Sequence, residues 1–301
     1  MISLIVATYG RSRELRAFFQ SLVAMDCRVT SFEVIVVDQN QDALIDGICR
    51  EFATILDLKH EKVTAKGVSK ARNHGALFAT GEIIAFPDDD CLYPEDLLTR
   101  VEEFFHRHPE KDMLFARGID KITQKNAVIR FKTRHTQVTK WNVYCTTVEF
   151  TMFIRRRVWL EIGGFDESFG LGTPFSAEEG ADFVFRALSS SMQGMYDPTL
   201  IVYHPIKVGR FDIIEHDRAW KYGMGLGRFT AKHLLGYGDI HAPLIFAYFQ
   251  YRACGGMLLG LLTLNPNRMK YYALLFAARS RGLFVSIPDY LGRKIPLHPN
   301  Q

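Results

Sequence analysis

Residues 83–90 read Ile-Ile-Ala-Phe-Pro-Asp-Asp-Asp, a short apolar run that ends in three adjacent carboxylates. The apolar residues predict a buried strand, and the proline after them marks its end. Three neighbouring carboxylates repel one another unless a cation or hydrogen-bond donors offset their charge. This stretch therefore predicts a strand with a polar site at its carboxyl end.

Three more strands and three helices precede this run. The strands are predicted at 3–8, 32–37 and 56–60, and the helices at 12–25, 42–52 and 69–80. Strands that alternate with helices at this spacing predict an α/β fold, with a mainly parallel sheet covered on both faces. Ligands bind outside the carboxyl ends of the strands in such sheets. This rule gathers Thr8, Asp38 and residues 88–90 on one rim.

The chain after residue 90 continues this domain and then becomes helical. Helices are predicted at 94–107 and 177–189, and short strands at 194–203 around the Asp197-Pro198 turn. Further helical segments are predicted at 212–235, 242–264 and 269–284. We therefore expect one α/β domain over residues 1–210 and a helical C-terminal region over residues 211–301.

The composition is that of a globular protein, with 48% hydrophobic and 23% charged residues among 301. Five scattered cysteines with no Cys-x-x-Cys pair favour reduced thiols over a disulfide framework or a zinc site. The N-terminus reads as a strand and has neither the basic segment nor the cleavage site of a secretory signal. We therefore expect a cytoplasmic protein.

The carboxylates at residues 88–90 suit a divalent cation. Mg²⁺ and Mn²⁺ take oxygen ligands, and they typically use one or two protein carboxylates together with substrate phosphates. The alternative is a solvated acidic turn that caps the helix near Pro94. The apolar strand before the triplet favours the metal.

Asp38 and Arg72 are candidates for nucleotide binding. Asp38 ends an apolar strand, where a carboxylate accepts hydrogen bonds from a base or a ribose. The alternative is that Asp38 caps the next helix. Arg72 falls in the first turns of a helix, where backbone N–H groups and the helix dipole favour an anion such as a diphosphate. The alternative for Arg72 is a surface ion pair.

Six segments occur in the order found in family 2 glycosyltransferases, and the chain resembles that family over about residues 1–205. The segments are 7–11, 37–38, 67–73, 86–90, 162–167 and 179–186. The resemblance implies a GT-A fold, which is a Rossmann-like nucleotide-binding domain with a mainly parallel sheet. It also implies a nucleotide-sugar donor.

The resemblance assigns roles to named residues. Asp90 and His204 are expected to hold a divalent metal, Mn²⁺ or Mg²⁺, with Asp88 facing the ribose. The expected nucleotide-binding residues are Thr8, Tyr9, Arg11, Asp38, Lys66, Arg72, Asp88 and Asp89. A lone His at the end of a strand is more often structural, so this role of His204 comes from the resemblance alone.

The catalytic segment of the family usually reads Glu-Asp-x-x-Leu-x-x-Arg at the start of a helix near the acceptor. Counting back from Arg186 places Glu179 at its first position, but Gly180 stands where the family has Asp. Inverting transfer needs a carboxylate that takes the proton of the acceptor hydroxyl. Glu179 and Asp182 are the expected catalytic residues and Glu178 is the reserve candidate. The alternative is that these acids merely favour the helix dipole.

The resemblance thus predicts an inverting, metal-dependent transferase that moves a sugar from a nucleotide diphosphate, with UDP expected as the carrier. The expected acceptor is a saccharide, plausibly lipid-linked and used in cell-surface polysaccharide synthesis. Two rival functions differ from this one. A sugar-1-phosphate nucleotidyltransferase has a Gly-rich first loop, whereas residues 8–11 hold a single Gly. A non-catalytic nucleotide- or saccharide-binding protein is suggested by Gly180.

The C-terminal region is basic and apolar. From residue 218 onward, eleven Lys and Arg stand against two Asp, a net charge of +9 in a chain whose total is +4. Residues 242–264 are nearly continuously apolar, but Arg252 near their middle makes insertion across a bilayer costly. We expect an interfacial helix at the inner face of the cell membrane, with a core helix or a homodimer contact as alternatives. The chain shows no recognised nucleic-acid module, so no nucleic-acid partner is expected.

Overall fold

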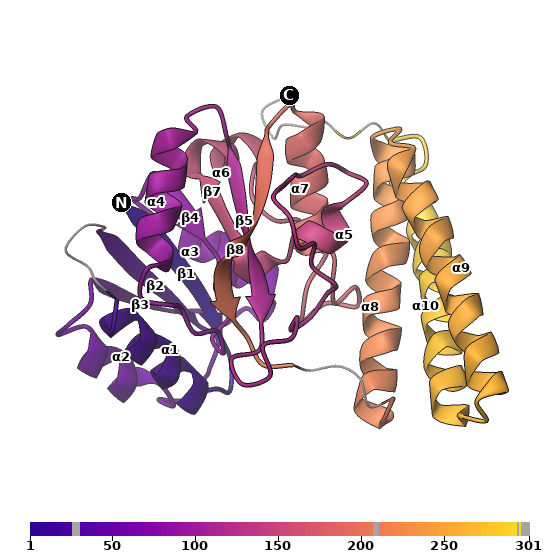
Figure 1. Cartoon of the computed structure of the whole chain (residues 1–301), viewed down its shortest axis with the longest axis horizontal. Coiled ribbons are helices and arrows are strands. Elements are labelled where there is room, and N and C mark those ends of the chain that lie inside the picture. The colour runs from indigo at the N-terminus through magenta and orange to yellow at the C-terminus, as the bar shows by residue number, and fades with distance from the viewer. Residues whose placement is uncertain (26–30, 207–210, 294, 296–301) are drawn as a thin grey trace. The chain divides into compact units, whose positions relative to one another are not determined.

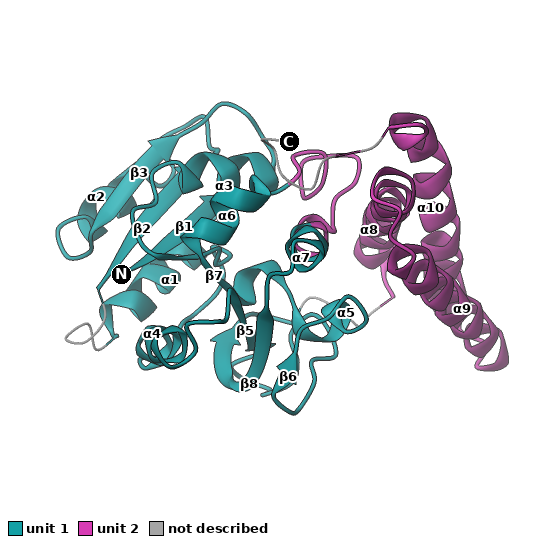
Figure 2. Ribbon diagram, turned by 90° about the horizontal axis from the view of Figure 1, so that it is seen from above, with its two compact units in different colours: residues 1–165, 183–207 teal, residues 166–182, 208–301 magenta. Residues whose placement is uncertain are grey.

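The computed structural model describes residues 1–25, 31–206, 211–293 and 295. The chain divides into two compact units, which are coloured separately in Figure 2. Unit 1 comprises Met1–Phe165 and Phe183–Lys207, and unit 2 comprises Asp166–Asp182 and Val208–Gln301. The predicted single boundary near residue 210 therefore misses one segment, because residues 166–182 group with the C-terminal helices.

Unit 1 is built on an eight-stranded mixed sheet in the order β3-β2-β1-β4-β7-β5-β8-β6 (Figure 1). Strands β1 to β4 run parallel, β7 is antiparallel to both its neighbours, and β5 and β8 are parallel. This confirms the predicted α/β architecture with a mainly parallel sheet. The strands are β1 Ile2–Thr8, β2 Phe32–Asp38, β3 Leu58–Lys62, β4 Ile83–Ala85, β5 Met113–Ile119, β6 Thr136–Gln137, β7 Met152–Arg155 and β8 Gly194–Tyr203.

Helices cover both faces of the sheet. Those outside the C-terminal region are α1 Arg13–Val23, α2 Asp46–Phe52, α3 Val68–Ala76, α4 Leu97–Arg107, α5 Val143–Thr146, η1 Glu149–Thr151, α6 Arg156–Ile162 and α7 Glu179–Ser189. The strand predicted as two short pieces at 194–203 is one strand, β8, because it pairs with β5 along both halves with a register shift between Phe115 and Arg117. Tertiary pairing thus overrides the turn that Asp197-Pro198 suggested.

The alternation of side chains along β1 explains the two covered faces. Ile2, Leu4 and Val6 point into one core cluster with side chains of α1, α2 and α4. Ile5 points to the opposite face, toward α3. A Cβ added at Gly75 of α3 would meet Ile5 Cγ2 at 2.6 Å, so glycine is needed for α3 to approach the sheet this closely.

The carboxyl ends of the parallel strands share one edge. Thr8 at the end of β1 is in register with Asp38 at the end of β2. Strand β4, beside β1, leads into residues 88–90, and β8 leads into His204. The sheet order therefore places the polar residues predicted for this rim on the same edge of unit 1.

Unit 2 contains three long helices, α8 Ile213–Ala231, α9 His241–Leu262 and α10 Pro266–Tyr290 (Figure 1). Helix α8 continues directly into a π-helical turn, η2 Lys232–Gly236. Glycines allow α8 and α10 to touch along their backbones. A Cβ at Gly227 would lie 2.3 Å from Arg279 O, and one at Gly282 would lie 2.2 Å from Met224 O. A larger residue at either glycine would force these two helices apart.

A buried carboxylate joins the first three strands. Glu33 on β2 is 1% exposed and accepts hydrogen bonds from Ser3 Oγ on β1 at 2.7 Å and from Lys59 Nζ on β3 at 2.8 Å. The backbone N–H and the hydroxyl of Thr80 also donate to it, at 2.7 and 2.6 Å. Burial alone would raise the pKa of Glu33, but these donors outweigh it and lower the pKa to about 2.

We expect Glu33→Gln to lower the free energy of unfolding at pH 7 by about 1–3 kcal/mol, because buried donors lose a charged acceptor. The carboxylate titrates at 4.5 when unperturbed and at about 2 in the fold. Its stabilisation is therefore present above pH 4.5 and is lost as the pH falls toward 2. Urea unfolding at pH 7 and at pH 3 measures this, with exposed Glu95→Gln as control. Equal stability of wild type and Glu33→Gln at pH 7 would contradict the assignment.

Candidate functional site

Two carboxylates and one imidazole converge at the carboxyl edge of unit 1. The potential ligand atoms of Asp88, Asp90 and His204 all lie within 4.8 Å of one another. His204 Nε2 is 3.6 Å from Asp88 Oδ2 and 3.3 Å from Asp90 Oδ1. Two carboxylate oxygens and one imidazole nitrogen form a donor set that suits Mn²⁺ or Mg²⁺ together with substrate oxygens. These three residues fit a metal, and Asp88 belongs to the group with the two predicted ligands.

His204 is held with one nitrogen toward the carboxylates. Its Nδ1 lies 2.9 Å from Pro205 O, and a carbonyl only accepts, so Nδ1 carries the proton of this bond. The ring is 4% exposed and stacks on Phe150 with centroids 4.5 Å apart. Desolvation works to lower the pKa of His204, but Asp88 and Asp90 raise it above its ordinary value. A bond from the other ring nitrogen to a backbone carbonyl fixes the tautomer of a metal-ligating histidine.

The side chain of Asp89 contacts Thr8 and Arg11. Its Oδ2 accepts from Thr8 Oγ1 at 2.8 Å and its Oδ1 from Arg11 at 2.7 Å. Arg11 also contacts Asp90 Oδ2 at 2.9 Å. Burial is the largest influence on Asp89 and, with the charge of Asp88, it raises the pKa to about 6 despite Arg11 and Thr8. Burial of the Asp89 carboxyl thus outweighs the two donors that contact it.

Arg72 is buried beside the triplet, with 3% of its surface exposed. One of its guanidinium nitrogens donates to Asp88 Oδ1 at 2.8 Å, and the guanidinium lies 5.7 Å from the centre of the Phe165 ring. Desolvation acts to raise the pKa of Asp88, but His204 and Arg72 lower it. The surface ion pair considered for Arg72 is therefore not what the structure has.

Tyr9 and Lys66 form an exposed pair on the same unit. Lys66 Nζ donates to the Tyr9 hydroxyl at 2.9 Å, and it lies 4.6 Å from the centre of the Tyr9 ring. The Tyr9 residue is 53% exposed. An aromatic ring and an ammonium group open to solvent can stack on and pair with a nucleotide. The structure thus brings together two residues that are 57 positions apart in the chain.

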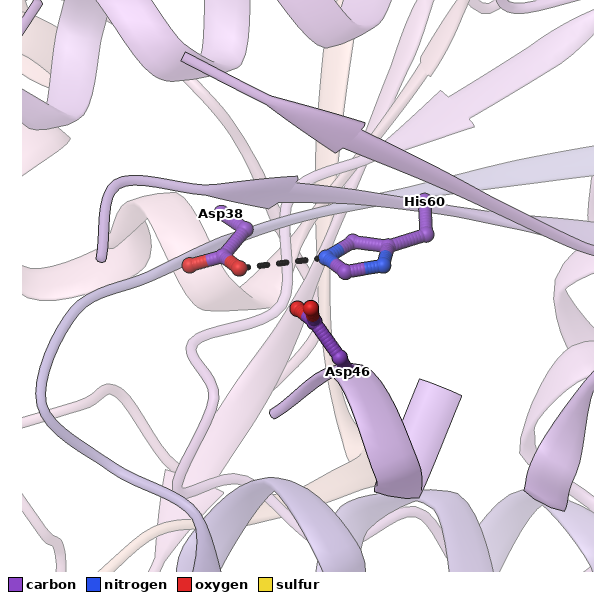
Figure 3. A group of neighbouring side chains, drawn as sticks. All are labelled: Asp38, Asp46 and His60. Carbon is purple, nitrogen blue, oxygen red and sulfur yellow. Dashed lines mark hydrogen bonds and ion pairs between the residues drawn. The ribbon is translucent and has the colours of Figure 1, made fainter. Parts of the chain in front are cut away.

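Asp38 is fully buried and contacts two neighbours, of which His60 is drawn in Figure 3. Its Oδ1 accepts from the backbone N–H and the side-chain amide of Asn40, both at 2.8 Å. Its Oδ2 lies 3.1 Å from His60 Nε2 on β3. Helix α2 begins at Asp46, so Asp38 is not the cap of that helix. Neither Asn40 nor His60 was predicted to contact Asp38. Asn40 follows Asp38 by two residues, whereas His60 comes near it through the pairing of β2 with β3.

Asp46 is the third member of the group drawn in Figure 3. The ligand atoms of Asp38, Asp46 and His60 lie within 4.8 Å of one another. Lys62 Nζ contacts Asp46 Oδ1 at 2.8 Å, so a lysine already supplies positive charge there. The lysine lowers the pKa of Asp46 below its ordinary value. We interpret this second group as an ion-pair network around Asp38.

The acids predicted to be catalytic lie at the start of α7, in unit 2. Glu179 is 7% exposed and Asp182 is fully buried. Glu178, just before the helix, has φ of 78°, a left-handed conformation that is uncommon outside glycine and clusters at functional sites. Asp182 Oδ1 lies 2.6 Å from Lys232 Nζ and 3.0 Å from His233 Nε2. Neither of these basic partners was predicted from the sequence.

Arg186 has a structural role within unit 1. It is 6% exposed and donates to Ile162 O and Gly164 O, each at 2.7 Å. Gly163 and Gly164 both have positive φ, 81° and 79°, a conformation that favours glycine. The hydrogen bonds from Arg186 satisfy the carbonyl groups of Ile162 and Gly164 in this turn. The arginine that ends the predicted catalytic segment thus holds the Gly-Gly turn.

The family of the chain is shown by a match between its sequence and a family model. Residues 3–161, more than half of the chain, match the family model described as Glycosyl transferase family 2. The chain belongs to glycosyl transferase family 2. The predicted resemblance is confirmed, and the chain is by family a glycosyltransferase.

Two curated relatives show how far the similarity extends. An uncharacterized glycosyltransferase of Haemophilus influenzae is 27% identical to this family 2 glycosyltransferase over 197 residues, which are 62% of each chain. Glucosyl-dolichyl phosphate glucuronosyltransferase of Haloferax volcanii is 25% identical over 185 residues, 56% of this chain and 57% of that protein. The matched stretch thus spans less than two thirds of the length of either relative.

Solved structures confirm the GT-A fold of this family 2 glycosyltransferase. TarS of Staphylococcus aureus, residues 1–349 in complex with UDP, aligns with a TM-score of 0.55 at 18% identity, covering 97% of this chain and 93% of that one. The mannosyltransferase PcManGT of Pyrobaculum calidifontis, in complex with GDP-Man and Mn²⁺, aligns with a TM-score of 0.63 at 16% identity. That alignment covers 94% of this chain and 87% of the other. Likeness at this level of identity shows the fold.

Proposed function

We propose that the chain is an inverting, divalent-metal-dependent transferase that moves a sugar from a UDP-sugar to a hydroxyl of a saccharide. The observation that carries this proposal is the group Asp88, Asp90 and His204, with Arg72 and Arg11 in contact with its carboxylates. Carboxylates for a cation and guanidinium groups for phosphate are what a diphosphate leaving group requires.

The nucleotide is assigned to the edge formed by β1, β2 and β4. Asp38 is fully buried with its oxygens on Asn40 and His60, so its proposed role is to hold the end of β2 in place for the base or ribose. Exposed Tyr9 and Lys66 suit the base face and the phosphates. UDP is the proposed carrier, because fold neighbours have been solved with UDP and with UDP-GlcNAc.

The reaction breaks the bond between the anomeric carbon and the diphosphate oxygen. A divalent cation held by Asp88, Asp90 and His204 would supply Lewis-acid neutralisation of the diphosphate charge. Arg11 is 39% exposed along its side chain, so it can turn from Asp89 toward phosphate oxygens. Arg72 holds Asp88 in place. The acceptor hydroxyl forms the new bond from the opposite side, and this single displacement inverts the anomeric carbon.

Glu179 is the proposed general base, which takes the proton as the acceptor oxygen attacks. Asp182 is the less suited of the two predicted acids, because it is fully buried and its Oδ1 is shared by Lys232 and His233. Glu179 stands in the first turn of α7, where the helix dipole stabilises its ionised form. Gly180 leaves that position without a side chain, so no acid at 180 competes for the role.

The proposed acceptor is a lipid-linked saccharide, presented at the inner face of the cell membrane during cell-surface polysaccharide synthesis. Relatives that match about a third of this chain include a minor teichoic acid biosynthesis protein of Bacillus subtilis, 29% identical over 108 residues. Among the described residues, no helix is both long and apolar enough to cross a membrane. We propose a contact of the C-terminal helices with the membrane surface.

The distribution of side chains on α9 supports this contact, because small residues are buried and large apolar residues are exposed. Its buried positions are mostly small, such as Ala253, Gly256 and Gly260, whereas large apolar residues face outward. The exposed ones on α9 include Leu244, Tyr248, Tyr251, Leu258, Leu259, Leu261 and Leu262. Exposed Arg252, Lys270 and Arg281 add positive charge to α9 and α10. Apolar residues mixed with cations suit an anionic lipid surface.

We expect the chain to release UDP from a UDP-sugar in the presence of Mn²⁺, and to lose this activity in EDTA. Asp90→Ala should abolish Mn²⁺-dependent binding of UDP, because it removes one of three ligands. Asp89→Ala should retain much of it, because Asp89 contacts Thr8 and Arg11 instead. Calorimetric titration with UDP, with and without Mn²⁺, measures both variants. Equal loss in the two variants would reject the ligand assignment, and full transfer in EDTA would reject the metal.

We expect Glu179→Gln to lower turnover by about 10² or more while UDP affinity stays near that of wild type, because a general base contributes on that order. Asp182→Asn and Glu178→Gln test the other two candidates, and exposed Glu95→Gln is the control. Release of UDP in single-turnover and steady-state assays gives kcat and KM separately. Near-normal turnover in both Glu179→Gln and Asp182→Asn moves the base to Glu178. Intact UDP binding with no transfer to any acceptor favours the non-catalytic binding protein.

We expect the chain to sediment with anionic vesicles at low salt and to be released by salt, because each Lys or Arg at such a surface contributes about 1 kcal/mol. The variant Leu258→Glu with Leu262→Glu should lose this binding. The matched control is Ile122→Glu in unit 1, which replaces a residue that is 90% exposed. Absence of vesicle binding, together with a dimer in analytical ultracentrifugation that the α9 variant dissociates, would assign this face to a homodimer.

A further inference from the structure

A buried charge network in unit 2 connects α7 with the end of α8. Lys232 Nζ contacts Asp182 Oδ1 at 2.6 Å and Asp166 Oδ2 at 2.7 Å. His233 Nε2 lies 3.0 Å from the same Asp182 oxygen. Lys232 is 4% exposed and His233 is 1% exposed. Two basic residues from one turn thus converge on one carboxylate of the predicted catalytic segment.

The local backbone at Lys232 and His233 is irregular. Helix α8 ends at Ala231, and residues Lys232–Gly236 form a π-helical turn. Turns of this type are rare in proteins and frequently occur at functional sites. The wider turn lets two consecutive residues reach Asp182, whereas consecutive side chains of a regular α-helix point about 100° apart.

The energetic cost of this arrangement argues against a purely stabilising role. Burying charged groups loses their hydration, and a buried ion pair is often no more stabilising than apolar residues of the same volume. The aromatic neighbours Phe229 and Tyr237 lie with centroids 4.4 and 5.2 Å from the His233 ring. An apolar residue would fit among these rings, so the choice of histidine indicates a requirement for the bond to Asp182.

We propose that Lys232 and His233 are positioning residues for the catalytic helix, acting through Asp182. The inference rests on the proposed function, in which Glu179 of the same helix is the base. The amide of Asp182 donates to Glu178 O at 2.8 Å, in the first turn of α7. Fixing the Asp182 side chain therefore fixes the turn that carries Glu179. The family match ends at residue 161, so this task is assigned to a part of the chain outside it.

The test replaces His233 with Phe, which keeps the ring packing and removes the bond to Asp182. We expect kcat for sugar transfer to fall 10-fold or more, since misplacement of a reacting group by about 1 Å can cost about 10²-fold. The affinity for UDP with Mn²⁺ should change less than twofold. His233→Gln restores a donor and should recover most of the turnover. Lys232→Gln should act in the same direction, and if it does not fold, His233→Phe decides, because it leaves the ion pair in place.

The matched control is His216→Phe, since His216 is a histidine of α8 that is 8% exposed and bonds Asn267 O instead of α7. It should lower stability comparably and leave kcat unchanged. Hydrogen exchange of the peptide covering α7 supplies a readout that needs no activity, and it should speed up in His233→Phe alone. Unchanged exchange and unchanged kcat in His233→Phe would overturn the inference. A wild type that transfers no sugar while exchange in α7 still responds would reject the proposed function and keep the positioning role.

Discussion

Negative charge at the end of β4 is the constraint on which unit 1 depends. Three consecutive carboxylates there can be tolerated only because separate elements supply donors to each of them. Arg72 comes from α3, Thr8 ends β1, and His204 follows β8. These partners meet because β1 and β8 place their carboxyl ends on the edge where β4 ends. The order of strands in the sheet is thus what makes the acidic edge possible.

This edge is better explained by ligand binding than by stability. The pKa of Asp89 remains raised to about 6, mainly by burial, although Arg11 and Thr8 both contact it. Burial disfavours the ionised form of this carboxyl, and positive charge nearby favours it. A protein that needed only a stable turn would be served by one carboxylate. The proposed metal and diphosphate, in contrast, use both the carboxylates and the cations that are paired with them.

The parts of the fold that follow local rules could be predicted from the sequence. Apolar runs ending in Thr8, Asp38 and residues 88–90 gave the strands and their common edge, because side-chain periodicity and the parallel α/β rule are local or topological. The single strand β8 could not be predicted, since its continuity across Asp197-Pro198 depends on pairing with β5. The same holds for the bond between Asp38 and His60, which depends on the register of β2 and β3.

The predicted catalytic segment at the start of α7 shows most clearly what could not be predicted from the sequence. Glu179 and Asp182 both belong to the first turn of α7, and the sequence treats them as equivalent acids. In the structure the two acids differ, because Asp182 is bound by two basic residues about fifty positions later in the chain. No local sequence pattern links these two segments. A carboxylate that carries two fixed donors has little freedom to accept a proton, whereas it is well suited to fix a backbone. In the proposed mechanism, the C-terminal helices therefore decide that Glu179 acts as the base and Asp182 as the anchor.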